Sequence, residues 1–544
     1  MTRLLPILLL ASSLNAADST LPREITTPFP TITNLAVEWQ IEGDDDLDAS
    51  CEMKFREVGT TEWRIGMPLR RVPAGSSQKT DPIITWTNRL SGSVFDLEAG
   101  TAYEIELTLH DPDGGEATRT VKVSTRPEPV AAKDAVIKNG SKADLNSAKP
   151  GEVILLADGD YGAVKFNRDG EPGKPIVYRS TSGKAIFSEV GLTDRKWVYL
   201  EGITVNGPVR LNNTEHCVVR RCKITAQYGI KAYKPGMMNG CIEDNLITGI
   251  RQWDPAIMGA DGDNEGEGIQ LTGSGNVIRH NRVSGFRDCL SHLEDGGAAV
   301  QMCNDWLNND ISAGLDDGIE ADFALSNCRI MRNRITNCFV GISSQPGLGG
   351  PNYFIRNVMF NLTYSAFKLH RYSIGDVILH NTVVKAGDGF GNYTSESFDH
   401  ALIQNNLFIG GKVPDVKYGG YDPGRGRGVD VQKFGEHCVI DFNAYASHGL
   451  AFQGKIRSWT FDKLPGTAFE PHGVQVTLDV LAKPAFPEDP ARVYDPPDLR
   501  LKQESTVQDI ATPFPNVNDT FNGRAPDPGA LEAGTDLPAY GPRA

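Results

Sequence analysis

Several features that would place the protein in a membrane or on a nucleic acid are missing from its sequence. Beyond the first residues it has no run of about 20 apolar residues, the length that a membrane-spanning helix needs. Basic residues are in the minority, with 54 against 69 acidic residues and a formal net charge of −15. We therefore expect neither membrane insertion nor a nucleic acid partner.

Aromatic residues are scarce as well, at 8% of the 544 residues, yet 40% of the chain is apolar. This composition excludes a disordered chain, and the length predicts two or three folded units. Cysteine motifs for metal binding are also absent, because none of the nine cysteines has a CxxC or Cys/His spacing. An odd number cannot all pair, so we interpret most of them as small core residues.

The first residues have the order of a secretory signal peptide. Met1-Thr-Arg3 is followed by an apolar run from Leu4 to Leu10 and then by small residues up to Ala17. The run is too short to span a bilayer, and no cysteine follows it for a lipid anchor. We expect residues 1–17 to be removed and the mature protein to be secreted or periplasmic.

Residues 28–127 predict a small β-sandwich, because short strands alternate there with Gly, Pro and Asp turns. The segment Leu97-Glu-Ala-Gly-Thr-Ala-Tyr103, closing with Ser-Thr-Arg-Pro127, resembles the end of a fibronectin type III domain. We expect a spacer or packing domain rather than a carbohydrate-binding module. The tryptophans that we expect in its core are Trp39, Trp63 and Trp86.

From about residue 134 the sequence repeats itself. Asparagine recurs with steps of 36, 28, 24, 24, 24 and 25 residues, at Asn245, Asn281, Asn309, Asn333, Asn357, Asn381 and Asn406. A unit of about 24 residues cannot bury its apolar face alone, so units must stack. A leucine-rich repeat would need a leucine scaffold, which is missing. The pattern predicts an all-β chain with a right-handed parallel β-helix at 134–411, in which stacked asparagines bond along the axis.

A second register marks one strand in each coil, as a small residue followed by a large apolar one. These pairs are Gly229-Ile230, Gly268-Ile269, Cys289-Leu290, Gly318-Ile319, Gly341-Ile342, Ala366-Phe367 and Gly389-Phe390. If the apolar residue points inward, the residues one and three positions later point outward. The first outward row is then Lys231, Gln270, Ser291, Glu320, Ser343, Lys368 and Gly391. The second outward row includes Tyr233, Asp322, Gln345 and His370.

Two long steps in the repeat predict insertions, at 251–267 and 291–299, and such insertions often line a binding cleft. The first carries Asp261 and Asp263, and the second carries Glu294 and Asp295. After residue 411 the repeat fades into Gly, Pro and aromatic residues. We interpret 412–544 as an irregular cap and tail packed on the helix, since an open last coil would be an aggregation-prone edge.

Acidic residues recur two positions before the inward residue of three successive coils, as Glu267, Asp288 and Asp317, and Asp316 adjoins the last. A single Asp at a strand start is most simply a turn residue. Three charges stacked about 4.8 Å apart repel one another, however, unless they serve a cation, a shared proton or a substrate. We predict a functional site here. Its expected substrate-binding residues are Glu320, Asp322, Gln345, Lys368, His370, Arg371 and His292.

The strand Leu315-Asp316-Asp317-Gly318-Ile319 resembles the Gly-Asp-Asp strand of polygalacturonases, which are β-helical inverting glycoside hydrolases. Asp288, one coil earlier, stands where that family has the Asp of its Asn-Thr-Asp motif. The resemblance implies Asp317 as general acid, and Asp288 and Asp316 as activators of water. The family's Gly-His-Gly motif has no counterpart, because Val340-Gly-Ile-Ser343 takes its place.

A polysaccharide lyase or uronate epimerase is the alternative reaction. Residues Pro150 to Tyr161 and Lys174 to Val177 are similar to the first coils of alginate and chondroitin lyases with this fold. In that case Glu267, Asp288 and Asp317 would bind Ca²⁺, and Lys368, His370 or Arg371 would remove a proton beside the uronate carboxyl group.

The expectation is therefore a monomeric, secreted enzyme that degrades an acidic or complex polysaccharide. As a hydrolase it would use Asp288, Asp316 and Asp317 and need no cofactor. A lyase would add Ca²⁺. A non-catalytic surface protein that binds carbohydrate, or an adhesion protein, would explain the acids as solvated turns.

Overall fold

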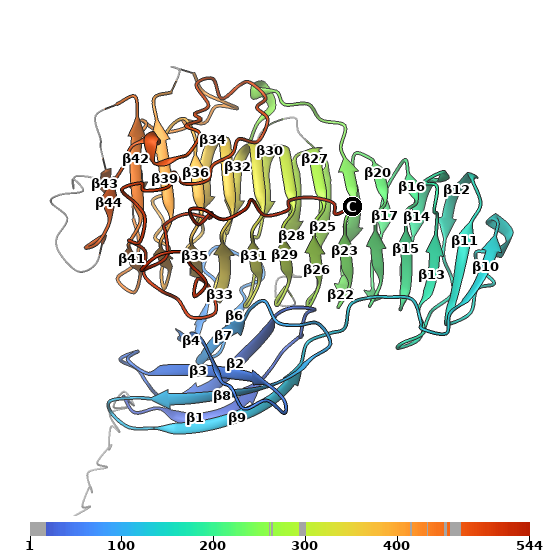
Figure 1. Cartoon of the computed structure of the whole chain (residues 1–544), viewed down its shortest axis with the longest axis horizontal. Helices are drawn as coiled ribbons and strands as arrows, with labels where there is room; N and C mark the ends of the chain where they lie inside the picture. Colours follow the sequence, from blue (N-terminus) through green and yellow to red (C-terminus); the bar gives the residue numbers. More distant parts are fainter. Residues whose placement is uncertain are drawn as a thin grey trace, which may run out of the picture.

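In a computed structural model, the chain forms an antiparallel N-terminal domain followed by a long parallel β-helix (Figure 1). The described residues are 18–544 except 260–261, 263–264, 293–300, 414–415, 432, 451–453 and 457–468. The predicted signal peptide at 1–17 lies outside them. Within the described part of the chain, no helix is long and apolar enough to cross a membrane.

The N-terminal domain is the predicted small β-sandwich. Its strands run in the order β1-β2-β7-β4-β3-β8-β9, and every neighbouring pair is antiparallel. β4 joins the two halves, because it pairs with β3 at its start and with β7 at its end. The strands are β1 (Leu21–Thr26), β2 (Leu35–Glu42), β3 (Ser50–Glu57), β4 (Arg64–Val72), β7 (Arg89–Val94), β8 (Ala102–His110) and β9 (Ala117–Ser124).

The three tryptophans of this domain have three different environments. Trp39 is fully buried in the sandwich core, as expected. Trp86, in the short strand β6 (Thr85–Trp86), packs instead with Leu348 of the β-helix, so it belongs to the domain interface. Trp63 lies against the Arg56 guanidinium, 4.3 Å from the ring centroid. The expectation that all three fill one core is therefore wrong.

The β-helix is built from two long parallel sheets. The first contains β10 (Val136–Gly140), β11 (Glu152–Leu156), β13 (Ile176–Arg179), β15 (Val198–Glu201), β19 (Val218–Arg220), β23 (Cys241–Glu243), β26 (Val277–Arg279), β29 (Asp305–Leu307), β31 (Arg329–Met331), β33 (Leu348–Ile355), β35 (Ile374–Leu379), β38 (Leu402–Gln404) and β41 (Val439–Asp441).

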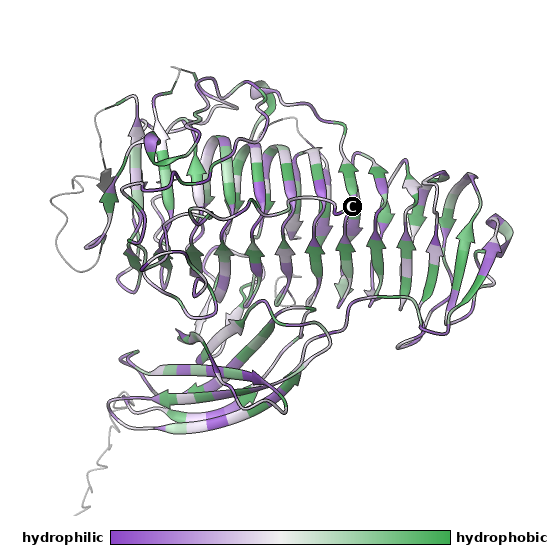
Figure 2. Cartoon of the chain, viewed as in Figure 1, coloured by the Kyte–Doolittle hydropathy of each residue, from purple (hydrophilic) through white to green (hydrophobic). Residues whose placement is uncertain are grey.

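The second sheet contains β12 (Gly159–Lys165), β14 (Ala185–Gly191), β16 (Thr204–Val205), β17 (Val209–Arg210), β20 (Lys223–Thr225), β21 (Ile230–Ala232), β24 (Leu246–Thr248), β25 (Glu267–Leu271), β27 (Arg282–Phe286), β28 (Asp288–His292), β30 (Asp310–Glu320), β32 (Arg334–Ser343), β34 (Val358–Lys368), β36 (Thr382–Val384), β39 (Leu407–Gly411), β42 (Ala444–His448) and β44 (Val474–Gln475). Hydrophobic residues recur on strand after strand along both sheets (Figure 2).

The predicted asparagine ladder forms at the corner between the two sheets. From Asn245 to Asn406, each side chain donates from Nδ2 to Oδ1 of the asparagine one coil further on, at 2.9–3.0 Å. The structure extends the ladder to Asn443 and then to the Glu470 carboxylate. Because every amide also bonds to backbone, the ladder satisfies buried polar groups along the axis.

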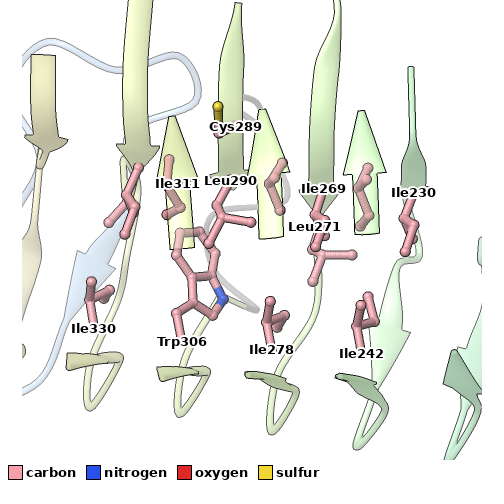
Figure 3. Close-up of a cluster of buried hydrophobic side chains, with 14 of the residues drawn as sticks. Ile230, Ile242, Ile269, Leu271, Ile278, Cys289, Leu290, Trp306, Ile311 and Ile330 are labelled. Atoms are coloured by element: carbon pink, nitrogen blue, oxygen red, sulfur yellow. The ribbon is translucent and has the colours of Figure 1, made fainter. Parts of the chain in front are cut away.

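The predicted strand register is confirmed from Ile230 to Phe367. Neighbouring strands pair Ile230 with Ile269, Ile269 with Leu290, and so on through Ile319 and Ile342. Figure 3 shows Ile230, Ile269 and Leu290 facing residues of the first sheet across the core. Phe390 departs from the series, because it pairs with Val429 in a separate small sheet of β37 (Phe390–Asn392), β40 (Val429–Val431) and β43 (Gly454–Ile456).

The small residue before each inward residue also faces the interior. A Cβ at Gly268 would lie 2.5 Å from Val283 Cγ1, and one at Gly318 would lie 2.8 Å from Ile335 Cγ2. Cys289, at the same position, is fully buried in the core. Two successive side chains thus point inward where the chain turns a corner. The residue preceding them therefore faces outward, which strict strand alternation would not produce.

The β-helix continues beyond residue 411, where we expected it to end. β39 pairs with β42, and β42 pairs with β44. The step from Asn406 to Asn443 holds a long insertion, which hides the repeat in the sequence. The final segment then runs back along the side of the helix (Figure 1), where Gly529 N–H donates to Asn405 and Arg543 pairs with Asp244.

The sandwich packs on the outer face of the first sheet (Figure 1). Phe95 lies edge-on to Tyr353 of β33, with ring centroids 5.0 Å apart. Buried around them are Met67, Leu307, Met331, Ile355, Val377, Leu379 and Leu402. All nine cysteines of the chain are unpaired and buried, which confirms their prediction as small core residues.

Candidate active site

The predicted acidic residues come together on the outer face of the second sheet. Glu267 of β25 pairs with Asp288 of β28, and the Asp317 N–H of β30 donates to Asp288 Oδ1 at 2.8 Å. Asp288, Asp316 and Asp317 each offer an oxygen, and these oxygens lie within 4.8 Å of one another. The corner in each coil produces this cluster, because it turns the residue before the small position outward.

These carboxylates are almost completely shielded from solvent. The side chains of Asp288, Asp316 and Asp317 are 1%, 5% and 0% exposed. Burial, together with the charges of Asp316 and Asp317, raises the pKa of Asp288 well above its usual value. Burial and the Asp288 charge likewise raise the pKa of Glu267. Asp288 and Glu267 therefore hold protons more tightly than exposed carboxylates do.

Two cations contact the acidic cluster. Lys368 Nζ at the end of β34 lies 2.8 and 3.1 Å from the two oxygens of Asp317. Arg287 Nη2 lies 3.3 Å from Asp316, and Arg287 Nε lies 3.6 Å from Asp288. Arg287 is 36% exposed, whereas Lys368 is 12% exposed. Sequence reasoning did not select Arg287, although its position beside Asp288 was a signal.

The protonation of Lys368 and Asp317 is mutually dependent. Burial lowers the pKa of Lys368, but Asp317 and the neighbouring carboxylates more than compensate and raise it well above its usual value. Burial raises the pKa of Asp317, while the ammonium of Lys368 opposes that shift. As long as the pair is undisturbed, Lys368 is an ammonium and cannot accept a proton.

The predicted substrate-binding residues beyond the cluster occupy the outward rows. Glu320 stands between Ser291 and Ser343 in the strand register, and its charge acts on Lys368. Asp322 accepts from Ser343 Oγ at 2.5 Å and from the backbone N–H of Gln345 at 2.8 Å. The backbone N–H of Gln345 thus helps to orient the Asp322 carboxylate.

His370 and Arg371 follow Lys368 in the chain. Burial, with the nearby Lys368 charge, lowers the pKa of His370 to about 4, so its imidazole is neutral at physiological pH. The Arg371 N–H donates to Glu396 at 2.6 Å, and Glu396 forms an ion pair with Lys79 of the sandwich. The N-terminal domain therefore reaches the segment beside the acidic cluster.

His292 is the predicted site residue that the structure directs elsewhere. It is fully buried, with its ring centroid 4.7 Å from that of Trp306 and Nε2 3.2 Å from the Asn304 amide. Its position in β28 matches that of Leu271 in β25, a core residue. His292 therefore points into the helix and not toward the acids, because it lies two positions after the inward Leu290.

The first predicted insertion packs beside the acidic cluster. Its residue Met258 is buried with Leu315, Phe339 and Val340, and Gly259 N–H donates to Leu315 at 2.8 Å. Because Leu315 directly precedes Asp316, this part of the insertion lies at the edge of the site. Asp261, Asp263, Glu294 and Asp295, which we expected in the two insertions, fall outside the described residues.

The cluster has the geometry and charge of a site for a divalent cation. Oxygen ligands of Ca²⁺ lie about 2.3–2.6 Å from the ion, so two of them stand at most about 5.2 Å apart, and the 4.8 Å limit here fits. The carboxylates of Glu267, Asp288, Asp316 and Asp317 outnumber the two contacting cations. An inverting hydrolase separates its carboxyl groups by about 6.5–9.5 Å, whereas here one oxygen of each aspartate lies within 4.8 Å of an oxygen of the other two.

One family model supports the fold. Residues 208–408 match the family model described as the right-handed β-helix region. A solved structure, a PL6 family alginate lyase named AlyGC, is similar with 12% sequence identity and a TM-score of 0.33. The match covers 59% of this chain and 53% of that one, so the chain spans about half the length of the alginate lyase. No curated protein matches the chain. Together with the two parallel sheets, the family match shows that the chain carries a right-handed parallel β-helix, preceded by a small antiparallel β-sandwich.

Proposed function

We propose that the protein is an enzyme that cleaves a uronate-containing polysaccharide by β-elimination, with help from a divalent cation such as Ca²⁺. The observation that carries the proposal is the contact of Lys368 with Asp317 inside a group of three close carboxylates. In keeping with the leader-like first residues, we propose that it acts outside the cytoplasm. We also propose that it acts as a monomer.

Lys368 is the base that the geometry favours. β-Elimination needs a base for the proton beside the uronate carboxyl group and positive charge to neutralise that carboxyl group. A cation bound by Asp288, Asp316 and Asp317 would supply charge to the site and release Lys368 from its partner. The pKa of Lys368 would then fall, because burial lowers it once the contact with Asp317 is lost. In this proposal Arg287, the more exposed cation, would bind the sugar carboxylate.

Glycoside hydrolysis is the second candidate, and a specific observation favours it. Burial raises the pKa of Asp288 and Asp317, and a general acid in a hydrolase needs such a shift to carry a proton at neutral pH. Against this reaction stand the short separation of the carboxylates and the ion pair of Asp317 with Lys368, which favours its ionised form.

Digestion of pectate, alginate and chondroitin separates the two reactions. A lyase releases reducing ends together with an ultraviolet absorbance from the new conjugated double bond, and here we expect a chelator to abolish both signals. Reducing ends without that absorbance would establish a hydrolase instead. Binding of these polysaccharides without cleavage of any of them would instead support a non-catalytic carbohydrate-binding or adhesion protein.

Two substitutions test the proposed centre. We expect Lys368→Met and Asp317→Asn each to lower kcat by about 100-fold or more, since each removes a proton-transfer or charge-placing group. Asp310→Asn is the matched control, because Asp310 lies in the same strand β30 but pairs with Arg282 and Arg334. It should keep kcat within about twofold of the unmodified enzyme. Equal losses in Asp310→Asn and Asp317→Asn would contradict the assignment.

A further inference from the structure

The coil that precedes the acidic cluster holds a lysine against two tyrosine rings. Lys231 Nζ lies 3.6 Å from the ring centroid of Tyr228 and 4.6 Å from that of Tyr233. Lys231 is part of β21, where it pairs with Gln270 of β25 in the first outward row. The three side chains are thus on the same outer face as the acidic cluster.

Lys231 has no ion-pair partner among the described residues, although burial lowers its pKa and the Glu267 carboxylate, beyond ion-pair distance, opposes that shift. Lys231 is only 7% exposed, yet none of the residues that the structure describes places a carboxylate at ion-pair distance from its Nζ. A cation–π contact offsets on the order of 2 kcal/mol of the cost of burying an ammonium, and it leaves the charge in place. Burial raises the pKa of both tyrosines, so neither supplies a negative charge. An anionic ligand would complete this arrangement.

The lysine lies in line with the proposed reaction centre. Tyr228 stands two residues before the inward Ile230, just as Glu267, Asp288 and Asp317 stand before theirs, so Tyr228 heads the same row. Coils follow one another at about 4.8 Å, which puts Lys231 two coils, or roughly 10 Å, from the level of Asp288. A short oligosaccharide lying along the helix axis spans this distance.

We propose that Tyr228, Lys231 and Tyr233 form a binding subsite for an acidic sugar unit next to the unit that is cleaved. This inference rests on the proposed function, because the same polysaccharide occupies both places. The substrate would lie parallel to the helix axis and cross successive coils, with Lys231 on one side of the aspartates and Lys368 on the other. Such a substrate carries carboxylates on neighbouring units, as a polyuronate does.

Binding measured without turnover tests the subsite. We would titrate the full-length Asp317→Asn protein with hexamers of galacturonate, mannuronate and guluronate and with their carboxyl-reduced, neutral counterparts. In this background, Lys231→Met should weaken binding of the preferred acidic hexamer by about tenfold, the loss typical of one charge-assisted contact, and leave neutral hexamers unaffected. Lys223→Met is the control, since Lys223 is an exposed lysine of the same coil in β20.

Two further variants keep the test decisive. Lys231→Arg should retain most of the affinity because it keeps the positive charge, and it stands in if Lys231→Met fails to fold, as judged by its thermal unfolding. Tyr233→Ala should weaken acidic binding by several-fold, because it removes one of the rings that hold the ammonium.

The outcomes separate this inference from the proposed function. Binding that depends on Lys231 in a protein that cleaves none of the polymers would support the subsite and refute the enzyme. Cleavage that depends on Lys368 with hexamer binding unchanged in Lys231→Met would support the enzyme and overturn the subsite. Absence of binding to any acidic hexamer would overturn the subsite as well.

Discussion

Buried carboxylates in this protein differ in the partners that surround them. Asp317 meets an ammonium, whereas Glu470 closes the asparagine ladder and accepts from hydroxyl and amide donors of the described residues. Asn443 Nδ2 and Tyr445 Oη each donate to Glu470 Oε1 at 2.6 Å. Burial nevertheless raises the pKa of Glu470 to about 8. The neutral form of this carboxyl group is therefore the one that suits the folded protein.

Glu470 should make stability depend on pH. Its pKa rises from an ordinary value of 4.5 to about 8 on folding, so the folded state binds the proton more tightly. This contribution to stability is complete below about pH 4.5 and is lost as the pH rises toward 8. We expect Glu470→Gln to lose less thermal stability than the unmodified protein between about pH 5 and about pH 9. Parallel melting curves for the two proteins across this range would contradict the prediction.

At the scale of elements, a row of buried side-chain hydrogen bonds stabilises the corner between the two sheets. Asn333 is fully buried, and its Nδ2 donates to Trp306 O and to Asn357 Oδ1. Its own Oδ1 accepts the backbone N–H and the side-chain amide of Asn309. One side chain thus satisfies polar groups on the coil before it and on the coil after it.

Removing one member of the ladder should weaken the helix. Asn333→Ala leaves a buried carbonyl, an amide and a backbone N–H unsatisfied, so we expect the free energy of unfolding to fall by about 2–4 kcal/mol. Denaturant unfolding measures this change. The control is Asn139→Ala in β10, where the asparagine is exposed and the expected change is within about 0.5 kcal/mol. Similar losses of unfolding free energy in both variants would mean that the ladder asparagine contributes no more to stability than an exposed asparagine does.

For the whole molecule, the contact between sandwich and β-helix includes a buried ion pair. Asp305 of β29 and Arg329 of β31 are both fully buried and paired with each other. The sandwich completes the site, because Thr31 and Asn34 donate to the second oxygen of Asp305 and Ser93 Oγ contacts Arg329. The sandwich therefore covers the first sheet, while the acidic cluster faces outward from the second.

The two domains should unfold together. Asp305→Asn removes the charge that compensates a fully buried guanidinium, so we expect a loss of about 3–5 kcal/mol and a lower Tm for the whole protein. Calorimetry checks the size of the shift and whether one transition remains. Asp96→Asn is the control, since the Asp96–Arg332 pair crosses the same interface but Asp96 is 51% exposed. A Tm unchanged in Asp305→Asn would show that the interface contributes little to stability.

Some of this molecule could be predicted from the sequence because its repeat makes the contacts regular. An asparagine at the same place in every coil stands next to the asparagines of the coils before and after it, so the period alone predicted the ladder and the helix. The register of inward residues then placed Lys368 near Asp317, two coils apart, as the structure finds. The helix beyond residue 411 was missed because a long insertion interrupts the period.

Only the tertiary structure decided which charges meet. The corner that turns Asp288 and Asp317 outward depends on two successive inward side chains, a bend that strand alternation does not predict. Alternation from Leu290 does place His292 inward, but the partners that enclose it there, Trp306 and Asn304, come from other parts of the coil. Arg287 joins the cluster because its long side chain reaches the next coil. The number of residues in each coil repeats along the chain and can therefore be read from the sequence. The partners of each side chain depend instead on how the bends of the folded backbone direct it.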